Sequence, residues 1–420
     1  MTNTKPSILF VSKRACISVA LIVAFLATGA VMRPSLPASA AQASDQKSSA
    51  APAKKAPDIP PMYPIRVSGQ FGYMDRTGKI VVTPQFQRAW DFHDGMARVD
   101  SATQGRGIID PAGKVTFLSK FSWIGDFSEG LAQVTVWDGS VKAGYIDTAG
   151  TLVIPTTWAF YGYPMSDLMM PPVWRRDRNA NFSEGLAAVR AADGKLGYID
   201  NTGKIVIPPQ FLYARPFSEG LAAVANDQFA FGYIDAHGKV VIPPMYQSVY
   251  PGNFSEGIAR VKASGEITFV DHKNTPQVIV KTGFWFAGYD FHDGMAKIGE
   301  NNIWSGFIDR SGSVVAEPHY RYATEFSEGL AAVVDKDGTS GYIDASGQVV
   351  IPLPNDTFGC QFRGGLARIF VDDPTTNAGK TQHHSEMAYI DKSGKFVLPP
   401  AVKTRTPQVI SLYDSLDNCD

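Results

Sequence analysis

Short apolar runs rich in β-branched and aromatic residues, divided by polar turns that contain glycine, make up most of the chain after residue 61. Residues 185–211 hold three of these runs, at 186–190, 196–200 and 205–207. Ala-Asp-Gly lies between the first two runs, and Asn-Thr-Gly lies between the last two. Short β-prone runs joined by such turns are typical of β-hairpins. The pattern therefore predicts a three-stranded antiparallel β-meander.

The residues that flank these runs have predicted structural roles. Asp200 can accept backbone N–H bonds as the first residue of a turn, and Gly203 can take the positive φ that a bulged hairpin needs. The Pro-Pro pair at 208–209 is predicted to end the third strand, because proline cannot donate to a ladder. Phe211 and Phe217 lie in the segment that leads to the next unit, and we expect them to pack one unit onto the next.

Two motifs recur along the chain and define a repeat. The first is Phe-Ser-Glu-Gly, with the variants Phe-His-Asp-Gly and Phe-Arg-Gly-Gly, and each copy is called a linker below. Successive linkers are 35 to 37 residues apart, except for one gap of 55. The linker glycines are Gly95, Gly130, Gly185, Gly220, Gly257, Gly294, Gly329 and Gly365.

The second motif is Gly-Tyr-Ile-Asp or a close variant. Its aspartate begins an Asp-x-x-Gly turn, called the Asp turn below, which is usually followed by Lys-[Ile/Val]-Val-Ile-Pro-Pro. Copies begin at nine positions, namely Gly72, Gly107, Gly144, Gly197, Gly232, Thr268, Gly306, Gly341 and Ala388.

These motifs predict the fold class. We expect an all-β chain with about nine tandem three-stranded β-meander repeats of about 36 residues over residues 62–400. A single meander is marginal in water, so neighbouring units must stack to build a core. The first unit begins with a strand at 63–67 and the last finishes its own third strand at 395–398, so no split unit is available to close a ring. An open β-solenoid is therefore favoured, and a propeller-like closed ring is the alternative.

The combination of Phe-Ser-Glu-Gly-Leu-Ala-x-Val, Gly-Tyr-Ile-Asp-x-x-Gly-Lys and Ile-Val-Ile-Pro-Pro-x-Phe resembles the bacterial WG-repeat family, also called the KWG-repeat family. The resemblance covers residues 63–400. It implies an all-β repeat module, often exported or joined to other domains, with no established catalytic activity. The tryptophan that gives the family its name is absent from all nine copies, where its position holds Phe71, Arg106, Ala143, Leu196, Phe231, Ile267, Ser305, Ser340 and Met387.

Residues 1–40 have the order of a secretory signal peptide. A Lys-Arg pair at 13–14 precedes a weakly polar to apolar run at 15–32, and the Ala-Ser-Ala triplet at 38–40 has the form of a cleavage site. We expect cleavage after Ala40 and a periplasmic or extracellular location. The alternative is an uncleaved membrane anchor, because the apolar run reaches the lower limit of a membrane span.

Two further segments and two cysteines complete the predicted organisation. Residues 41–61, rich in Ala, Ser, Lys and Pro, are expected to be a disordered linker, and residues 401–420 form a C-terminal tail. After removal of the signal, only Cys360 and Cys419 remain, and an export compartment permits their oxidation. They are a candidate disulfide that would tie the tail to the last repeat, with two unpaired thiols as the alternative.

Composition and charge narrow the class of protein. Hydrophobic residues make up 44 % of the chain and aromatic residues 11 %, which excludes a wholly disordered protein. The 39 basic and 40 acidic residues nearly balance; residues 1–40 hold four of the basic ones and no acidic one, which leaves 35 against 40 in the rest. We therefore expect no nucleic-acid partner, and no membrane partner beyond the possible N-terminal anchor.

Catalytic chemistry has little support in the sequence. The chain has no H-E-x-x-H, C-x-x-C, G-x-S-x-G, Walker-type or G-x-G-x-x-G motif, so we expect no enzyme and no cofactor or metal. Carboxylates of neighbouring units could act as the acid and base of a glycosidase only if two of them faced each other at ~5 to 9.5 Å. We favour a structural role, in which the linker glutamates cap local backbone N–H groups or pair with lysines of the neighbouring unit. These glutamates are Glu129, Glu184, Glu219, Glu256 and Glu328.

The gap of 55 residues between linkers contains an insertion that is our candidate binding site. Aromatic side chains with flanking arginines are enriched at recognition surfaces. The alternative is a segment that covers an exposed strand edge. The candidate contact residues are Trp158, Phe160, Tyr161, Tyr163, Trp174, Arg175 and Arg176.

The resulting functional hypothesis is an exported, non-enzymatic binding or scaffold repeat protein whose partner is a protein or a cell-envelope glycan. The alternative is an envelope polysaccharide hydrolase that uses carboxylates between repeats. The repeated occurrence of these carboxylates favours the first hypothesis, because a catalytic site usually departs from the repeat.

Overall fold

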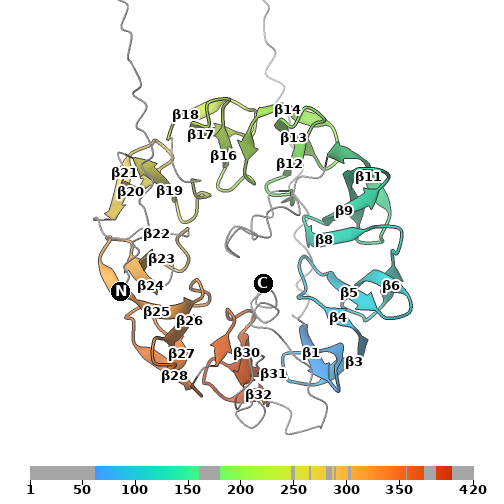
Figure 1. Ribbon diagram of the computed structural model, residues 1–420, viewed down its shortest axis with the longest axis vertical. Helices are drawn as coiled ribbons and strands as arrows, with labels where there is room; N and C mark the ends of the chain where they lie inside the picture. Colours follow the sequence, from blue (N-terminus) through green and yellow to red (C-terminus); the bar gives the residue numbers. More distant parts are fainter. Residues whose placement is uncertain are drawn as a thin grey trace, which may run out of the picture. The chain divides into compact units, whose positions relative to one another are not determined.

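The computed structural model describes residues 62–159, 180–246, 251–263, 266–280, 286–287, 290–300, 304–355, 357–372 and 385–399. All regular elements within these ranges are β-strands, as the sequence predicts. They form seven antiparallel sheets that follow one another in chain order (Figure 1). The same ranges contain no apolar helix of membrane-spanning length.

Each sheet is built from strands that are neighbours in sequence. The first four sheets are β1–β3, β4–β7, β8–β14 and β15–β18. Their strands are β1 (Tyr63–Val67), β2 (Gln70–Met74), β3 (Ile80–Phe86), β4 (Arg88–Ala89), β5 (Ala97–Ser101), β6 (Gly105–Ile109), β7 (Val115–Phe117), β8 (Trp123–Ser128), β9 (Leu131–Trp137), β10 (Val141–Asp147), β11 (Leu152–Ala159), β12 (Leu186–Arg190), β13 (Leu196–Asp200), β14 (Ile205–Phe211), β15 (Tyr213–Ala214), β16 (Leu221–Ala225), β17 (Phe231–Asp235) and β18 (Val240–Tyr246).

The other three sheets are β19–β21, β22–β28 and β29–β32. Their strands are β19 (Ile258–Ala263), β20 (Glu266–Asp271), β21 (Pro276–Val280), β22 (Phe286–Ala287), β23 (Met295–Glu300), β24 (Trp304–Asp309), β25 (Val314–Ala323), β26 (Ala331–Asp335), β27 (Ser340–Ile343), β28 (Val349–Leu353), β29 (Phe358–Gly359), β30 (Leu366–Asp372), β31 (Ser385–Asp391) and β32 (Phe396–Leu398).

Strands β12, β13 and β14 form the predicted meander, paired antiparallel in that order. The side chain of Asp200 accepts hydrogen bonds from the backbone N–H groups of Thr202 and Lys204, at 2.9 and 3.0 Å. Gly203 has a φ of 85°, in the left-handed region that favours glycine. The turn roles predicted for Asp200 and Gly203 are therefore confirmed.

The prediction that the Pro-Pro pair at 208–209 ends the third strand is wrong. Strand β14 continues through both prolines, and its register with β13 shifts beside Tyr198. This irregularity is a bulge, which tolerates residues that cannot donate to the ladder. The bulged backbone packs directly on Gly197, where a Cβ would lie 2.4 Å from the carbonyl oxygen of Ile207. That close approach explains the glycine of the Gly-Tyr-Ile-Asp motif.

Consecutive units stack through their Asp turns and linkers. A Cβ added to Gly203 would lie 3.1 Å from the side chain of Ile154 in the preceding unit, so the turn rests on that unit's third strand. Phe217 is buried, its ring meets that of Tyr198 edge-on at a centroid distance of 4.9 Å, and Phe211 packs at the border of the same core. The predicted packing roles of Phe211 and Phe217 are confirmed.

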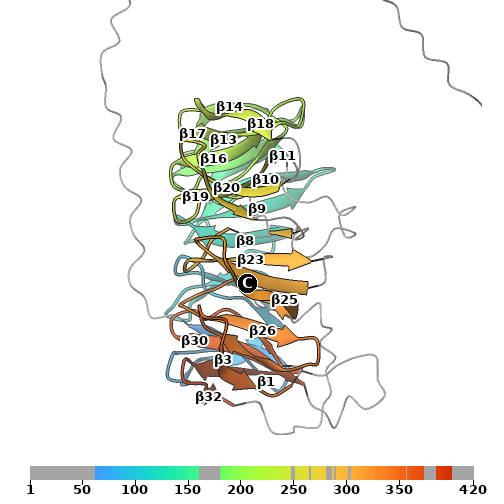
Figure 2. The same ribbon diagram turned by 90° about the vertical axis from the view of Figure 1, so that its left-hand side faces the viewer.

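The first and last repeats contact each other. Sheet β1–β3 lies beside sheet β29–β32 in both views of the fold (Figures 1 and 2). A Cβ added to Gly78 of the first Asp turn would lie 2.8 Å from the carbonyl oxygen of Val397 on β32, and the Tyr389 hydroxyl donates to the Pro64 carbonyl at 2.7 Å. The shared hydrophobic cluster consists of Tyr63, Ile65, Met74, Cys360, Leu366, Phe370, Met387 and Tyr389.

A buried ion pair joins the same two ends. The guanidinium of Arg368 on β30 binds the carboxylate of Asp91, which follows β4, and the Arg368 side chain is only 7 % exposed. Burial works to lower the pKa of Arg368, but the Asp91 carboxylate and the Tyr389 hydroxyl together more than offset it, so the net pKa is raised. These contacts between the two ends bear on the choice between the open β-solenoid that the sequence favoured and the alternative, a propeller-like ring.

Candidate functional site

A ladder of hydrogen bonds connects successive linkers. In each bond the carboxylate at the third linker position accepts from the backbone N–H of the next linker's glycine. The acidic residues that accept these bonds have φ values of 50 to 55°. The ladder begins at Asp94 and ends at Gly365. The pairs are Asp94–Gly130, Glu129–Gly185 (2.9 Å), Glu184–Gly220 (2.9 Å), Glu219–Gly257 (2.9 Å), Glu256–Gly294 (3.0 Å), Asp293–Gly329 (2.7 Å) and Glu328–Gly365 (3.2 Å).

A second bond reinforces the ladder, because each linker serine hydroxyl donates to the carbonyl of the next linker's phenylalanine. The distances are 2.6 to 2.7 Å at Ser128, Ser183, Ser218, Ser255 and Ser327. The linker carboxylates therefore hold neighbouring units together. The linker glutamates have the structural role that we favoured, but the N–H groups that they cap belong to the next unit and are not local, as the prediction had them.

At three places a basic side chain from an Asp turn also contacts the linker glutamate. The Arg310 guanidinium donates to the Glu256 carbonyl at 2.7 Å and lies 3.6 Å from its carboxylate. The Lys392 ammonium donates to the Glu328 carbonyl at 3.0 Å and lies 3.1 Å from its carboxylate. His272 takes the same position, and its ring contacts the Glu219 carbonyl at 3.0 Å. Each of these basic residues directly follows the aspartate of its turn.

The last linker departs from this arrangement. Its sequence is Phe-Arg-Gly-Gly, so Gly364 stands where the other linkers have an acidic residue. The φ of Gly364 is 59°, close to the values of those acidic residues, so the backbone keeps the linker conformation without the carboxylate. Arg76 follows the aspartate of the first Asp turn, the position that Arg310 and Lys392 hold in theirs. Arg76 forms no hydrogen bond or ion pair with any residue that the structure describes.

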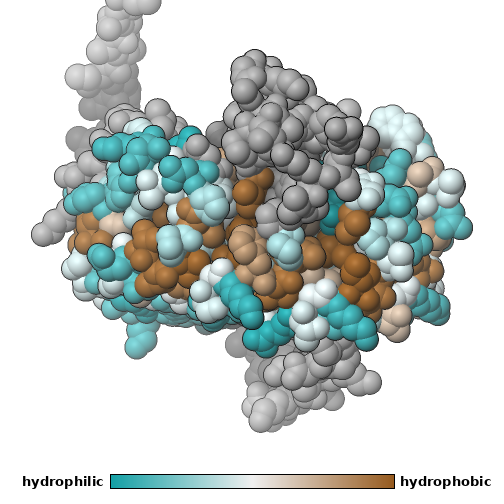
Figure 3. Space-filling model, turned by 90° about the horizontal axis from the view of Figure 1, so that it is seen from below, coloured by the Kyte–Doolittle hydropathy of each residue, from teal (hydrophilic) through white to brown (hydrophobic). Residues whose placement is uncertain are grey.

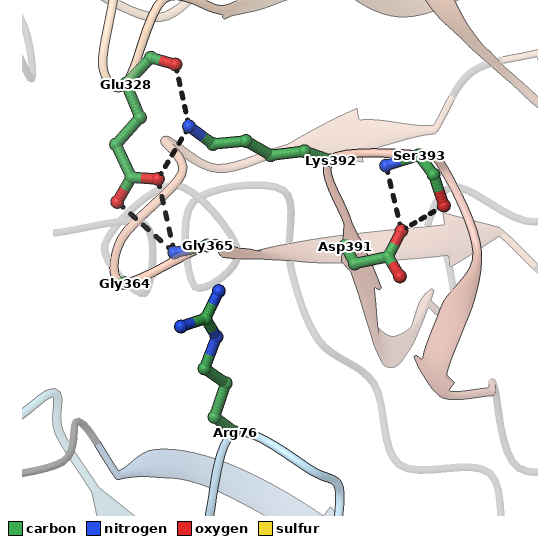
Figure 4. A pocket seen from close by; sticks show the side chains of 7 residues that line it. All are labelled: Arg76, Glu328, Gly364, Gly365, Asp391, Lys392 and Ser393. Carbon is green, nitrogen blue, oxygen red and sulfur yellow. Dashed lines mark hydrogen bonds and ion pairs between the residues drawn. The ribbon is translucent and has the colours of Figure 1, made fainter.

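The departure coincides with a pocket of about 530 Å³ between the first and last repeats (Figure 4). In the close-up the Arg76 side chain points from the first repeat toward the backbone of the last linker. The pocket is lined by Arg76, Glu328, Gly364, Gly365, Asp391, Lys392 and Ser393.

The other charged groups of the pocket are already engaged. Glu328 accepts from Lys392 and from the Gly365 N–H. Asp391 accepts from the hydroxyl of Ser393 at 2.6 Å, and this hydrogen bond lowers the pKa of the Asp391 carboxyl. Arg76 is therefore the lining cation that retains its full capacity to bind an anion.

Tyr63 fixes the linker backbone beside the pocket. Its hydroxyl lies 2.9 Å from the Arg363 carbonyl oxygen and 3.1 Å from that of Gly364. Desolvation by burial raises the pKa of Tyr63 to about 12, partly offset by the charge of Arg76. The hydroxyl therefore stays protonated at neutral pH and can donate to these carbonyls.

The side chains that line the pocket belong to arginine, lysine, glutamate, aspartate and serine residues. Its lining contains no histidine or cysteine to serve as a nucleophile, base or soft metal ligand. Across the described ranges there is no group of three or more His, Cys, Asp or Glu side chains that could hold a metal ion. The arrangement is suited to holding a ligand in place.

The structure places only one residue of the candidate aromatic site. Trp158 lies on β11, where it pairs with Ala143, and its half-buried side chain packs against a core cluster that includes Tyr145 and Phe182. This contact gives Trp158 a role in packing. Phe160, Tyr161, Tyr163, Trp174, Arg175 and Arg176 lie outside the described residues, so the aromatic binding site stays a prediction.

Cys360 is disulfide-bonded and buried in the cluster that joins the first and last repeats. The other cysteines of the chain, Cys16 and Cys419, lie outside the described residues. Pairing of Cys360 with Cys419 therefore stays a prediction.

The pocket is not among the sites predicted from the sequence, although two sequence features point to it. The last of the eight linkers is the one without an acidic residue, and Arg76 occupies the turn position of Arg310 and Lys392. The missing acidic residue of the last linker indicates a site only once the first repeat is known to contact that linker.

Comparison with protein families agrees with the repeated motifs. The sequence model of a family described as "WG containing repeat" matches residues 71–100, 107–136, 197–228, 231–265 and 306–339. The chain therefore carries WG repeats in these five segments. Each matched segment contains one Asp turn and the linker that follows it. No curated protein matches the chain.

Several solved structures are similar to the chain at low sequence identity. BamB from Moraxella catarrhalis is 11 % identical, with a TM-score of 0.42 over 74 % of this chain and 90 % of that one. Hsv2p from Kluyveromyces lactis is 7 % identical, with a TM-score of 0.39 over 68 % and 93 % of the two chains. The computationally designed Ika4 protein is 16 % identical, with a TM-score of 0.23 over 30 % and 87 %.

Proposed function

We propose that this protein is an exported, non-enzymatic binding or scaffold protein that presents a ring of nine repeats to a protein partner. The observation that carries the proposal is a band of exposed aliphatic side chains that recurs from repeat to repeat. The family match and the β-repeat fold support the same role.

The aliphatic band lies at the start of the third strand in six of the described meanders, on β3, β11, β14, β18, β25 and β28. Two consecutive residues there are exposed in most units, and consecutive side chains point to opposite faces of a strand, so both faces are uncovered at this point. Exposed apolar surface is typical of protein interaction sites, and Figure 3 shows brown hydrophobic patches among teal hydrophilic side chains on one side of the molecule. The residues, each 38 to 49 % exposed, are Ile80, Val81, Leu152, Val153, Ile205, Val206, Val240, Val241, Val314, Val349 and Val350.

The contacts between the first and last repeats support closure of the ring. They use the interactions that stack other neighbours, since Gly78 rests on Val397 as Gly203 rests on Ile154. A closed ring also removes the exposed end faces that an open array must cover. The ring would therefore present the band around a rigid body.

Export is supported by two features. Residues 1–40 have the order of a signal peptide, and Cys360 is disulfide-bonded. Disulfides persist in oxidising compartments such as the periplasm. These features agree with a periplasmic or extracellular location.

The hydrolase alternative is less well supported, because the linker carboxylates bind backbone N–H groups of the next unit. Carboxylates that hold neighbouring units together in this way have a structural role. A cell-envelope glycan remains the alternative ligand for the aromatic insertion, since aromatic rings are suited to stacking on sugars.

A pull-down from the envelope fraction tests the proposal. The test protein carries Val206→Asp, Val241→Asp and Val350→Asp in the aliphatic band. The matched control carries the same number of added charges on exposed positions of the Asp turns, namely Asn201→Asp, Ala236→Asp and Ala345→Asp. A partner retained by the wild type and the control and lost from the band variant supports the proposal. Equal retention by all three contradicts it.

Two further arms separate the alternatives. Removal of residues 161–176 tests the aromatic insertion, and loss of binding there alone would move the site from the band to the insertion. Fractionation of the cells and sequencing of the mature N-terminus test export, with Ala41 as the expected first residue. A cytoplasmic protein that keeps Met1 would contradict the predicted location.

A further inference from the structure

We propose that the pocket between the first and last repeats binds a carboxylate group of a ligand, in the place of the glutamate that is missing at residue 364. This site is separate from the aliphatic band and does not depend on it. The ligand class is any molecule that presents one carboxylate on a short flexible stem, such as an acidic side chain or a peptide C-terminus.

The other repeats show what the empty position normally contains. Where an Asp turn supplies a cation, that cation contacts the linker glutamate of the neighbouring unit. Arg310 with Glu256 and Lys392 with Glu328 are both bonded through the carbonyl and paired through the carboxylate. At Arg76 the cation and the linker backbone are both in place, but the carboxylate of the linker is missing because residue 364 is glycine.

The geometry of the last linker preserves the site. A Cβ added to Gly365 would lie 2.5 Å from Nη2 of Arg76, so the guanidinium rests against the linker backbone (Figure 4). The Tyr63 hydroxyl holds the Gly364 carbonyl and fixes that backbone. The pocket volume of about 530 Å³ falls within the roughly 300 to 1,000 Å³ of small-molecule sites.

The charges of the pocket favour a carboxylate over a phosphate. Arginine binds a carboxylate through two parallel N–H bonds. Lys392 is neutralised by Glu328, and Asp391 adds a further negative charge. One arginine matches the single charge of a carboxylate, whereas the second charge of a phosphate dianion would be unpaired and would be repelled by Asp391.

Titration of the full chain by calorimetry tests the proposal, with three probes of defined chemistry. N-acetyl-glutamate amide presents an acidic side chain, N-acetyl-alanine presents a C-terminal carboxylate, and inorganic phosphate is the competing anion. We expect one site with a dissociation constant in the range of roughly 0.1 to 10 mM for at least one carboxylate probe. The stronger of the two carboxylate probes identifies the source, and phosphate should bind at least about tenfold more weakly.

Three variants tie the binding to this pocket. Arg76→Met removes the cation and should weaken binding at least about tenfold. Gly364→Glu supplies the missing carboxylate within the chain and should abolish binding without unfolding, because seven acidic residues adopt this backbone conformation elsewhere. Glu256→Gly removes the carboxylate that pairs with Arg310, as Gly364 leaves Arg76 without one. It should therefore create a second site, so that two probe molecules bind per chain.

The results that overturn the proposal are equally definite. Binding unchanged by Arg76→Met or by Gly364→Glu would place the ligand elsewhere. No heat from either carboxylate probe, tighter binding of phosphate, or a single site in Glu256→Gly would each contradict the assignment. Thermal unfolding of each variant, measured in parallel, separates a lost site from a lost fold. None of these outcomes bears on the aliphatic band, whose test uses different residues.

Discussion

Replacement of Glu184 separates the two opposing contributions of a linker glutamate to stability. Glu184 is exposed, has a φ of 55°, and its carboxylate accepts from the Gly220 N–H at 2.9 Å. The left-handed conformation costs a non-glycine residue about 1 kcal/mol or more. The charge-assisted hydrogen bond to the next unit offsets that cost by about 1 kcal/mol at an exposed site.

Glu184→Ala should therefore lower the free energy of unfolding by about 1 kcal/mol, because it keeps the backbone strain and loses the bond. Glu184→Gly should lower it by roughly 0.5 kcal/mol or less, because relief of strain exceeds the added entropy of the unfolded chain. Glu184→Gln keeps an acceptor and should lie between the wild type and the alanine variant.

Urea unfolding monitored by tryptophan fluorescence gives these differences, and hydrogen exchange of the Gly220 amide reports the bond itself. Exchange at Gly220 should accelerate in both the alanine and the glycine variants. A glycine variant less stable than the alanine variant would refute the strain argument. Unchanged exchange at Gly220 would refute the role of the bond.

Three further predictions concern the turns, the bulge and the disulfide. The hydrogen bond from Ser346 is the main cause that lowers the pKa of the Asp344 carboxyl. The stabilising contribution of Asp344 is therefore present above the ordinary pKa of about 3.9 and is lost as the pH falls through the folded-state pKa. Asp344→Asn should reduce the loss of stability that urea unfolding measures between about pH 5 and pH 2.5. Gly197→Ala should lower the free energy of unfolding by about 3 kcal/mol, because the added Cβ would meet the Ile207 carbonyl. Gly194→Ala should lower it by about 1 kcal/mol, because Gly194 has a positive φ but faces open space. Equal losses in thermal unfolding would contradict the contact. If Cys360 pairs with Cys419, mass spectrometry of a non-reduced digest should recover the linked peptides, and two alkylated thiols would exclude the pair.

The repeating unit is predictable from sequence because its local signals agree with one another. Apolar runs, Asp turns and linker glycines all indicate the same meander, and residues 186–190 and 196–200 form strands with the predicted bounds. The role of Phe217 follows from the same pattern, since an apolar residue between two short meanders must be buried by both.

The course of the third strand could not be predicted, because proline normally interrupts a ladder. The Pro-Pro pair at 208–209 remains in β14 since a bulge places it against Gly197. This arrangement depends on the fit of two strands, and no local propensity records it. The sequence signal for this bulge was the recurrence of the motif glycine together with a Pro-Pro pair.

The contact between the two ends and the pocket could not be predicted for a related reason. Asp91 and Arg368 are far apart in sequence, and nothing near either residue indicates the other. The absence of an acidic residue at Gly364 was visible, but its consequence depends on Arg76 from the first repeat. Contacts of this range follow from the curvature of the whole array, which the sequence of one unit does not determine.

The most direct test of the account is a double-mutant cycle between Asp91 and Arg368. Asp91→Ala alone leaves a buried guanidinium without its carboxylate and should cost about 3 to 5 kcal/mol in free energy of unfolding. Arg368→Met with Asp91→Ala removes both charges and should recover part of that loss, giving a coupling energy of about 2 kcal/mol or more. Additive effects, within about 0.5 kcal/mol, would show that the first and last repeats do not meet, and would contradict both the closed ring and the carboxylate pocket at its junction.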